Sequence, residues 1–527
     1  MKKFVWLIII VLLAGILRFW HITQVPPALN SDEIAIGYNA YSILTTGRDE
    51  YGTPHPLLFR SFDDYKMPVY VYLVAGSMKL FGYGDFAVRF PSAFLGTFTV
   101  LCTYLFALEL LKRHDIAFMS SFLLAISPWS IHFSRSGYEA NVAVFFIVLG
   151  SYLFMKGLLR GRWLILSSLS FSVAIWTYLT PRIFVPLLFV GFAAIYRREL
   201  WKQKIYVVAS AIVACMLLYP IAKMSLSPEG QMRAAGVSAF ANPDDIKKSA
   251  LRTMVDEKNG QKLFTVFDNR RISYAITFLR GYFAHFDPNF LFLDKSIEKY
   301  RAPDTGLLYL FELPLILAGC YVLVKKWSKS SATIFWWILV SPVAAAFTLQ
   351  LPHPVRTLVF LPAWQILSAV GFVASWEKLR RIRWILVAVI FVSVVYYLHQ
   401  YFVFLPVEDA SYWYVGRREM TAKIVSYEKA YDKIIVSNTL DFPYIFYLYY
   451  LPVQPAVYLK AGGTISGGFN EQGNHFGNIE FRSISTSERD PLKKILFVGT
   501  PAEVFKKSLV VDTISYPDGS PAIEFFE

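Results

Sequence analysis

The sequence predicts a multi-pass α-helical membrane protein, and three observations indicate this fold class. Apolar stretches of about 15–23 residues recur as far as residue 405, and roughly 20 apolar residues suffice to cross a bilayer as a helix. Of the 527 residues, 55% are hydrophobic and only 17% are charged, whereas a soluble protein carries about a quarter charged residues. The loops between the apolar stretches also alternate in charge, which predicts how the chain crosses the membrane.

The length of each apolar stretch predicts about eleven transmembrane helices. The opening MKKFVWLIIIVLLAGIL has the basic start and apolar body of a signal peptide, but it lacks a small-x-small cleavage site, so we interpret it as a retained first span. Residues 68–81 are too short to span and are predicted to form a helix in the outer membrane interface. The expected spans lie near residues 4–19, 89–111, 115–133, 139–157, 162–179, 182–196, 204–222, 304–324, 331–349, 355–375 and 383–405.

The net charge of +14 is unevenly distributed along the chain. Basic loops such as KGLLRGR, YRRELWKQK and EKLRRIR alternate with loops that are acidic, aromatic and rich in proline. This alternation is the positive-inside pattern, which places the basic loops in the cytoplasm. We therefore expect an integral plasma (inner) membrane protein with its N-terminus inside and its C-terminus outside. Membrane lipids are its expected surroundings, and no nucleic-acid partner is needed to explain the charge.

The domain organisation follows from this topology. Residues 1–405 are expected to form the transmembrane domain, with two large extracytoplasmic segments at 20–88 and 223–303. Residues 406–527 are long enough for a separate extracytoplasmic domain. Strand-like runs KIIVSN and KILFVGT, a helical stretch around DFPYIFYLYYL and a hairpin with an Asp-Gly turn predict an α/β fold for it.

The three cysteines, Cys102, Cys215 and Cys320, all lie within apolar stretches. None is placed for a disulfide in a water-exposed domain, and no Cys/His spacing typical of a metal site is present. They are predicted to be core packing residues.

Asp32 and Glu33 follow Asn30 shortly after the first apolar stretch. A structural explanation is a helix start, with Asn30 as the cap and Glu33 three residues later. Adjacent residues point about 100° apart on a helix, so at most one of the two carboxylates can face a substrate as a base. The other is then structural or orienting.

Single cationic and polar groups lie at the other predicted extracytoplasmic turns, although the positive-inside rule removes most Lys and Arg from that side. Each could be an interfacial anchor, but ionisable groups in such places tend to be paired or functional. Together with a carboxylate they suit glycosyl transfer from a phosphate-linked donor, in which a base deprotonates the acceptor and cations stabilise the departing phosphate. The groups are Lys66, Arg135, Glu139, Asn141, Tyr178, Arg182, His353 and Arg356.

Several segments resemble glycosyltransferase family 39, which includes protein O-mannosyltransferases and lipid A aminoarabinose transferases. The acidic pair, DYKMPVYVYL and GYGDFAVRFPSAFLGTFTVL follow one another in the family's order. The segments SPWSIHFSRSGYEAN and YLTPRIFVPLL are similar to its bacterial members. The resemblance covers roughly residues 1–200, with a looser match in the later spans. It implies the GT-C fold, a polyprenyl- or dolichyl-phosphate monosaccharide donor, transfer on the outer face and inversion at the anomeric carbon.

The resemblance also implies roles for particular residues. Asp32 matches the family's catalytic base and Glu33 its acidic neighbour. Lys66 matches the lysine of a Lys-Pro-Pro segment implicated in binding the lipid phosphate, although Met67 replaces the first proline here.

Further matches lie in the later turns. Arg182 and Arg356 resemble arginines near the donor phosphate, and we place Tyr178 and His353 beside them. Glu139 or Asn141, close to Arg135, corresponds to a second polar site.

Two absent motifs narrow the donor class. The Trp-Trp-Asp signature of oligosaccharyltransferases and an Asp-x-Asp pair are both missing. We therefore expect a lipid monophosphate donor and no essential metal or other cofactor, although a divalent metal is possible. The acceptor can be a protein or a glycolipid. A polyprenyl-lipid flippase or transporter is the main alternative, and a membrane scaffold with an outer binding module is another.

Overall fold

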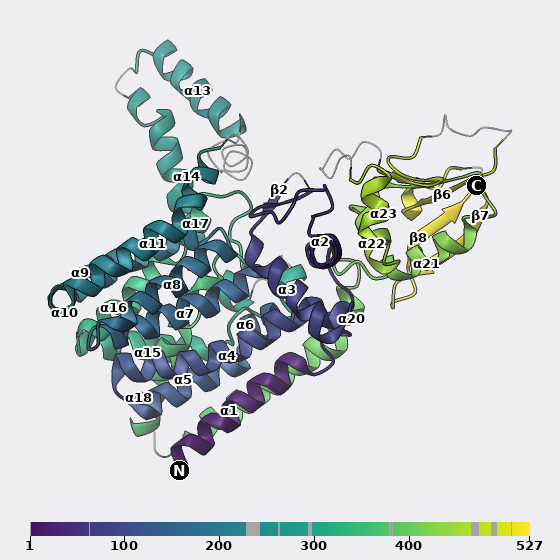
Figure 1. Ribbon diagram of the computed structural model, residues 1–527. Coiled ribbons are helices and arrows are strands. Elements are labelled where there is room, and N and C mark those ends of the chain that lie inside the picture. Colours follow the sequence, from purple (N-terminus) through teal and green to yellow (C-terminus); the bar gives the residue numbers. More distant parts are fainter. Residues whose placement is uncertain are drawn as a thin grey trace.

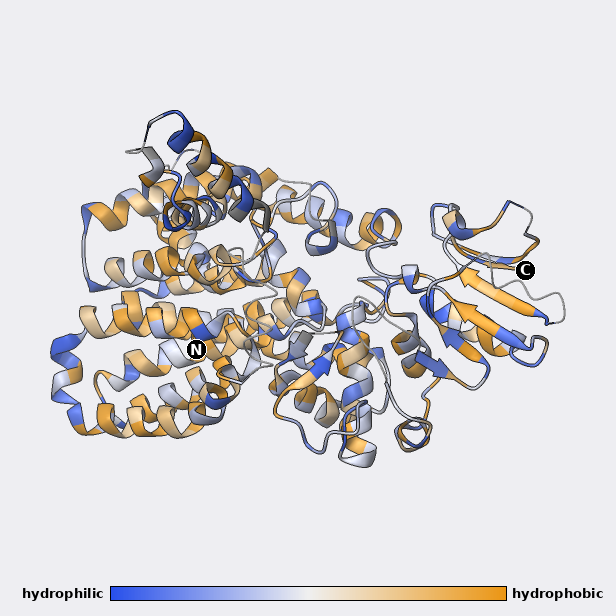
Figure 2. Cartoon of the chain, turned by 90° about the horizontal axis from the view of Figure 1, so that it is seen from above, coloured by the Kyte–Doolittle hydropathy of each residue, from blue (hydrophilic) through white to orange (hydrophobic). Residues whose placement is uncertain are grey.

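The computed structural model describes residues 2–62, 64–227, 243–261, 264–293, 298–378, 381, 383–464, 474–485, 493–506 and 508–527. The chain forms a bundle of apolar helices with a smaller α/β part, built on a sheet, at its C-terminal end (Figure 1). Hydrophobic residues predominate along the bundle helices, and hydrophilic residues gather in the segments that connect them (Figure 2). This distribution fits the predicted polytopic membrane protein.

The bundle is built from long helices and the short ones that interrupt them. Its elements are α1 (Lys2–Phe19), α4 (Asp85–Leu111), α5 (His114–Ile126), α6 (Pro128–Arg135), α7 (Glu139–Gly157), α8 (Arg162–Thr177), α9 (Pro181–Ile195), α10 (Arg197–Lys202), α11 (Lys204–Ser225), α15 (Glu312–Lys325), α16 (Lys329–Val340), α17 (Val343–Ala346), α18 (Ala363–Lys378), α19 (Arg383–His399), the π-helix η6 (Gln400–Phe404) and α20 (Leu405–Glu408).

Glycines allow two bundle helices to pack closely. A Cβ atom on Gly371 of α18 would lie 1.9 Å from the carbonyl oxygen of Leu315 in α15. One on Gly319 would lie 2.2 Å from the carbonyl oxygen of Leu367. Small residues bring helix backbones together in this way inside membranes, where van der Waals packing drives helix association.

The structure does not confirm the number of eleven spans. Among the described residues, five helices are long and apolar enough to cross a membrane, or six if the bent pair α5–α6 counts as one span. Shorter apolar helices include Phe4–Phe19 and Pro181–Ile195. The span predicted over 115–133 is bent, because α5 and α6 meet at 54°. Pro128 begins α6 and Ser127 caps it, and a proline cannot continue the hydrogen-bonding pattern of the preceding helix.

A second group of elements lies at the end of the bundle that faces the C-terminal sheet, which we call the loop end. It comprises α2 (Ser31–Thr46), the antiparallel strands β1 (Phe59–Ser61) and β2 (Asp64–Lys66), α3 (Pro68–Phe81), α13 (Pro243–Lys258), η2 (Phe264–Val266), α14 (Arg270–Ala284), η3 (Asn289–Leu293), η4 (Glu298–Tyr300) and η5 (Leu358–Phe360). The helix predicted over 68–81 is confirmed as α3. In Figure 1, α13 and α14 project sideways from the bundle.

The C-terminal part contains a six-stranded sheet in the order β4-β5-β3-β6-β8-β7. Strand β3 runs parallel to β5 and β6, whereas β8 is antiparallel to β6 and β7. The predicted strands and the Asp-Gly hairpin are confirmed as β3, β6 and β7–β8. The elements are α21 (Arg417–Tyr427), β3 (Lys433–Val436), η7 (Asn438–Leu440), α22 (Pro443–Tyr450), α23 (Pro455–Lys460), β4 (Asn474–Phe476), β5 (Ile479–Phe481), β6 (Ile495–Gly499), η9 (Pro501–Glu503), β7 (Val510–Ser515) and β8 (Pro521–Phe526).

The C-terminal part packs directly against α2. A Cβ atom on Gly37 would lie 2.6 Å from the ring of Tyr449 in α22, so glycine is needed for this approach. The hydroxyl of Tyr83 also donates a hydrogen bond to the backbone carbonyl of Tyr449 at 2.6 Å. Helix α22 of the C-terminal part therefore supports the helix that carries the acidic pair.

The cysteine prediction is partly wrong. Cys102 is buried and Cys320 is half-buried, but Cys215 is exposed on α11. Helix α11 has few residues buried within the protein. Its sequence is apolar nearly all round, so its exposed side suits contact with lipid.

Candidate active site

A polar cavity of about 570 Å³ lies at the loop end of the bundle. Residues from α2, β2, the α6–α7 connection, the α8–α9 turn, η4, α17 and the turn before η5 line it. Seven of the ten site residues predicted from the sequence are among them: Asp32, Lys66, Glu139, Tyr178, Arg182, His353 and Arg356. The fold thus brings together side chains that lie more than 300 residues apart in the sequence.

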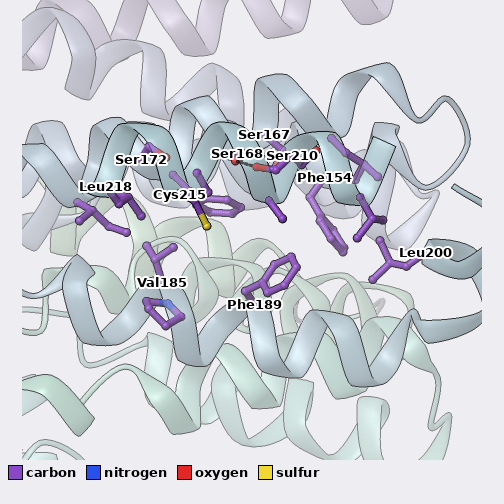
Figure 3. Close-up of a pocket in the computed structure, with 17 residues that line it drawn as sticks. Phe154, Ser167, Ser168, Ser172, Val185, Phe189, Leu200, Ser210, Cys215 and Leu218 are labelled. Carbon is purple, nitrogen blue, oxygen red and sulfur yellow. Dashed lines mark hydrogen bonds between the residues drawn. The ribbon is translucent and has the colours of Figure 1, made fainter. Parts of the chain in front are cut away.

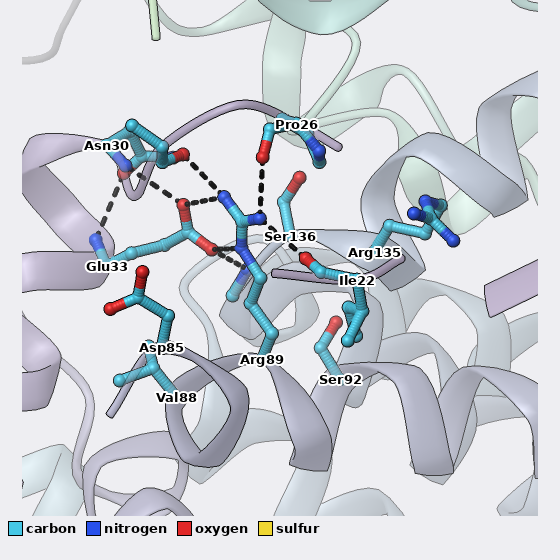
Figure 4. Close-up of polar contacts among 12 residues, drawn as sticks. Ile22, Pro26, Asn30, Glu33, Asp85, Val88, Arg89, Ser92, Arg135 and Ser136 are labelled. Carbon is cyan, nitrogen blue, oxygen red and sulfur yellow. Dashed lines mark hydrogen bonds and ion pairs between the residues drawn. The ribbon is translucent and has the colours of Figure 1, made fainter. Parts of the chain in front are cut away.

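The start of α2 divides the acidic pair between two environments. The Asn30 side chain accepts a hydrogen bond from the Glu33 backbone N–H, and the Glu33 carboxylate accepts one from the Asn30 N–H, which forms a capping box. The Glu33 carboxylate also receives the Gly137 N–H at 2.7 Å and the Arg89 Nε at 2.9 Å (Figure 4). Glu33 is fully buried and does not line the cavity, so its predicted catalytic place is not supported by the geometry.

Asp32, the other member of the pair, lies at the cavity wall. Its Oδ1 is 2.6 Å from the Nζ of Lys66, and its side chain is 49% exposed against 10% for Lys66. Lys66 ends β2, and Pro68 begins α3 two residues later, so a strand end and a helix start fix its position. Asp32 therefore combines access to the cavity with a cationic partner.

Two arginines face the same cavity from other elements. Arg182, in the first turn of α9, donates hydrogen bonds to the Oγ of Ser225 at 3.3 Å and to the Sδ of Met67 at 2.8 Å. Arg356 donates to the Oγ1 of Thr348 at 2.6 Å and to the backbone carbonyl of Leu349. These hydrogen bonds fix both guanidinium groups at the cavity, where they contribute positive charge.

A buried histidine supports the turn that carries Arg356. The Nε2 of His285 accepts a hydrogen bond from the His353 N–H at 3.1 Å, and its Nδ1 is bonded to the Gly281 carbonyl at 2.7 Å. Burial lowers the pKa of His285 to about 4, against a hydrogen bond that raises it. Burial, with the nearby Arg356 charge, lowers the pKa of His353 to about 3. Both imidazoles are therefore neutral at neutral pH.

Besides Glu33, two other predicted site residues lie inside the protein instead of in the cavity. Arg135 donates hydrogen bonds to the backbone carbonyls of Leu17, Trp20 and Val25 and is fully buried. The amide of Asn141 donates to the Ser92 carbonyl at 3.0 Å. Of the three groups predicted for a second polar site, the cavity contains only Glu139.

Sequence reasoning missed some residues of the site. Tyr138 and Tyr300 line the cavity, and Arg89 holds Glu33 beside it. Arg89 lies within the segment GYGDFAVRFPSAFLGTFTVL, but no pattern in the surrounding sequence indicated that it pairs with Glu33. Tyr300 lies in the large segment 223–303, where no motif singled it out.

An apolar groove of about 350 Å³ runs between α8, α9 and α11 (Figure 3). Ile175, Val185, Cys215 and Leu218 are among its lining residues. Ile175 precedes the cavity residue Tyr178 by three positions, and Val185 follows Arg182 by three. Each pair is therefore less than one helical turn apart in sequence, so the groove begins next to the polar cavity.

The cavity offers a definite chemistry. Lys66, Arg182 and Arg356 can bind an anionic group such as phosphate, for which guanidinium offers bidentate contacts. Asp32 can accept a proton next to it. The described residues contain no group of three or more His, Cys, Asp or Glu side chains arranged to hold a metal ion.

Residues 65–223 match the model of the family described as dolichyl-phosphate-mannose-protein mannosyltransferase. This segment contains Lys66, Glu139, Tyr178 and Arg182. Among curated proteins, the chain is 31% identical over 112 residues to an uncharacterized protein of Aquifex aeolicus (strain VF5). That match covers 20% of this chain and 22% of the relative.

Solved structures share the fold at low sequence identity. ArnT from Cupriavidus metallidurans, bound to undecaprenyl phosphate, is 13% identical with a TM-score of 0.56, and the match covers 99% of this chain and 98% of that one. The oligosaccharyltransferase of Archaeoglobus fulgidus, tethered with an acceptor peptide, is 14% identical with a TM-score of 0.51, covering 85% of this chain and 63% of its own length. These matches and the family model confirm the resemblance drawn from the sequence. The chain thus has the fold of these glycosyltransferase structures, and its residues 65–223 are similar to the dolichyl-phosphate-mannose-protein mannosyltransferases.

Proposed function

We propose that this chain transfers a single sugar from a polyprenyl-phosphate donor to an acceptor hydroxyl, with Asp32 as the base. Lys66, Arg182 and Arg356 bind the donor phosphate. The observation that carries this proposal is that a carboxylate and three cationic side chains, distant in the sequence, line one cavity.

The three cations bind the phosphate of the donor and also stabilise it as it leaves the sugar. Phosphate carries two negative charges near neutral pH once the sugar has left, and charge-assisted hydrogen bonds from Lys and Arg are the strong ones. Because the three side chains come from β2, α9 and the turn before η5, they can surround the group instead of meeting it from one side. Stabilising this growing charge lowers the barrier to breaking the bond between the sugar and the phosphate.

Asp32 completes the reaction on the acceptor. The acceptor oxygen attacks the anomeric carbon, the bond from that carbon to the phosphate oxygen breaks, and the phosphate leaves with the bonding electrons. The acceptor proton passes to the Asp32 carboxylate. Attack from the face opposite the phosphate inverts the anomeric carbon. Glu33 acts indirectly, since its buried pair with Arg89 fixes the start of α2.

The apolar groove accounts for the donor's tail. A polyprenyl chain anchored at Arg182 can run along α8, α9 and α11, where Ile175, Val185 and Leu218 offer apolar contacts. The tail would thus hold the donor in the membrane while its phosphate reaches the cavity.

The remaining expectations belong to the same proposal. Lys and Arg alone can neutralise one phosphate, so no essential metal is required. The reaction is placed on the extracytoplasmic face of the inner membrane, where the positive-inside pattern puts the loop end. The acceptor is a hydroxyl on a protein or on a glycolipid.

A labelling experiment tests this function. Membranes containing the chain are incubated with radiolabelled polyprenyl-phosphate sugars, and label is sought in protein and in glycolipid fractions. The parental chain should transfer label, whereas Asp32→Asn should bind the donor and transfer none. The matched control is Asp115→Asn, which also removes a carboxylate that is 49% exposed and ion-paired, but at the other end of the bundle. Transfer by Asp32→Asn at the parental rate would disprove the base, and donor movement across the membrane without product would favour a flippase.

A further inference from the structure

Lys299 is linked through Tyr414 to the start of α2, which carries Asp32, although it belongs to a segment without any recognised motif. It is part of η4 and precedes Tyr300, which lines the cavity. Its backbone carbonyl accepts a hydrogen bond from the Nε2 of His132 at 3.1 Å, so the main chain is fixed there. Its ammonium group lies 5.7 Å from the centroid of the Tyr414 ring.

Three separate segments meet around this lysine. Tyr414 belongs to the connection between α20 and α21, and its hydroxyl accepts a hydrogen bond from the Oγ of Ser31 at 3.5 Å. Ser31 is the first residue of α2 and directly precedes Asp32. Lys299 is therefore tied through one aromatic ring to the helix turn that presents the base.

The charge on Lys299 acts on Asp32. Burial lowers the pKa of Lys299, but Tyr414, Asp32, Tyr300 and Glu33 raise it more, so the pKa ends above its ordinary value. Electrostatic coupling is mutual, and a cation whose charged form is stabilised by Asp32 stabilises the ionised form of Asp32 equally. In the part of the chain that the structure describes, the ammonium of Lys299 contacts an aromatic face and makes no ion pair. Its charge thus stays available to the cavity.

Lys66 cannot stabilise the ionised Asp32 carboxylate throughout the reaction. Its ammonium is 2.6 Å from Asp32 Oδ1, but under the proposed function it also binds the donor phosphate. A phosphate dianion competes for this ammonium, and its negative charge raises the pKa of a neighbouring carboxyl group. A base must be ionised before it can accept a proton. A further cation near Asp32 would keep its carboxylate ionised when the donor is bound.

We infer that Lys299 is the counter-cation that keeps Asp32 ionised while Lys66 engages the donor phosphate. This inference rests on the proposed function and adds a positioning residue to it. In this role Lys299 acts through Asp32, and no bond to Lys299 forms or breaks.

Other ionisable groups face the same space and must be separated from this effect. Among the described residues, the Glu33–Arg89 pair lies behind Asp32, and the ionisable groups around Asp32 include Lys66, Tyr138, Glu139, Tyr178, Arg182, Lys299, Tyr300, His353, Arg356 and Tyr414. Asp32 and Glu139 are the carboxyl groups among the described residues that line the cavity, so either can shape the acid side of a pH profile. Repeating the test in a Glu139→Gln background isolates Asp32.

The experiment compares Lys299→Gln and Lys299→Arg with the parental chain. The turnover number at saturating donor is measured from pH 4 to pH 8, together with equilibrium binding of undecaprenyl phosphate. Removing the cation should raise the Asp32 pKa and move the acid limb of the profile to higher pH by about one unit. At pH values below the acid limbs of both chains, a shift of one unit makes the turnover of Lys299→Gln about tenfold lower than that of the parental chain. Lys299→Arg keeps the charge and should keep the parental limb.

Measurements of donor binding distinguish this role of Lys299 from direct binding of the donor phosphate. Lys299→Gln should bind undecaprenyl phosphate as the parental chain does, whereas Lys66→Gln should bind it more weakly. An unmoved acid limb in Lys299→Gln would overturn the inference, as would a loss of donor affinity or a higher acceptor KM without a pH shift. If Lys299→Gln does not fold, the position of the limb in Lys299→Arg decides alone, since an unchanged charge must leave it in place. Absence of transfer by the parental chain would instead disprove the proposed function.

Discussion

Glu33 and Arg89 form a fully buried ion pair, with Nε 2.9 Å from Oε1 and at most 1% of either side chain exposed. Taking two charges out of water is unfavourable unless their remaining hydrogen-bonding groups are satisfied. Here Arg89 also donates to the backbone carbonyls of Ile22, Pro26 and Ala28. The pair joins α2 to α4. This junction fixes the start of α2 so that the neighbouring carboxylate, that of Asp32, lies at the cavity.

Arg89→Leu should destabilise the chain strongly, because it leaves the Glu33 carboxylate buried without its cation. Removing one partner of a buried ion pair lowers the free energy of unfolding by about 3–5 kcal/mol. Thermal or denaturant unfolding of purified protein in detergent measures this. The control is Arg113→Leu, since Arg113 is 46% exposed in its pairs with Asp115 and Glu377, and a surface pair contributes about 0–1 kcal/mol. Equal losses in the two variants would contradict the structural role of Arg89.

Arg356→Gln should weaken binding of the donor phosphate by about tenfold or more, since a charge-assisted hydrogen bond contributes about 1.5–3 kcal/mol. Equilibrium binding of undecaprenyl phosphate provides the measurement. Arg162→Gln, at the start of α8 and away from the cavity, serves as the control. Unchanged affinity in Arg356→Gln would remove this residue from the site.

His285 predicts a pH dependence of stability. Its folded pKa of about 4 lies below the ordinary value of 6.5, so the unfolded chain binds the proton more readily. The stability contributed by the neutral imidazole is therefore fully present above pH 6.5 and is lost as the pH falls toward 4. His285→Gln can keep both hydrogen bonds, from the amide nitrogen to Gly281 and from the His353 N–H to the amide oxygen, without titrating.

The free energy of unfolding, followed from pH 7 to pH 4, tests this expectation. The parental chain should lose more stability over this interval than His285→Gln does. Since His353 also has a lowered pKa, part of the pH dependence should persist in the variant. Identical slopes for the two chains would show that His285 does not hold the turn in its neutral form.

Cys215→Trp should fill part of the apolar groove and weaken binding of long-chain polyprenyl phosphates. A short-chain analogue, which does not reach that depth, should bind as before. Val208→Trp is a suitable control, because Val208 lies on the same helix and is 59% exposed but does not line the groove. An equal effect on long and short chains would place the donor's tail elsewhere.

Much of the site could be predicted because its signals are local or topological. The helix start at Asn30 follows from a capping pattern within four residues, and the hairpin β7–β8 follows from an Asp-Gly turn. Single cations at the loop end contradict the charge bias of their loops, which is why Lys66, Arg182 and Arg356 could be selected without knowing that they meet.

The remainder depended on contacts between distant segments. Which of Asp32 and Glu33 faces the cavity is decided by Arg89, and no local pattern connects the two elements. Arg135 looked like Arg182 in the sequence, yet backbone carbonyls near the end of α1 bind it inside the protein. The break between α5 and α6 was missed because apolar composition extends across Pro128.

The most direct test of the account is a structure of the chain with undecaprenyl phosphate bound in a lipid nanodisc. The account predicts the phosphate in the polar cavity, within hydrogen-bonding distance of Lys66, Arg182 and Arg356, with the Asp32 carboxylate facing the same space. A phosphate bound outside this cavity, or an Asp32 carboxylate turned away from it, would contradict the central claim.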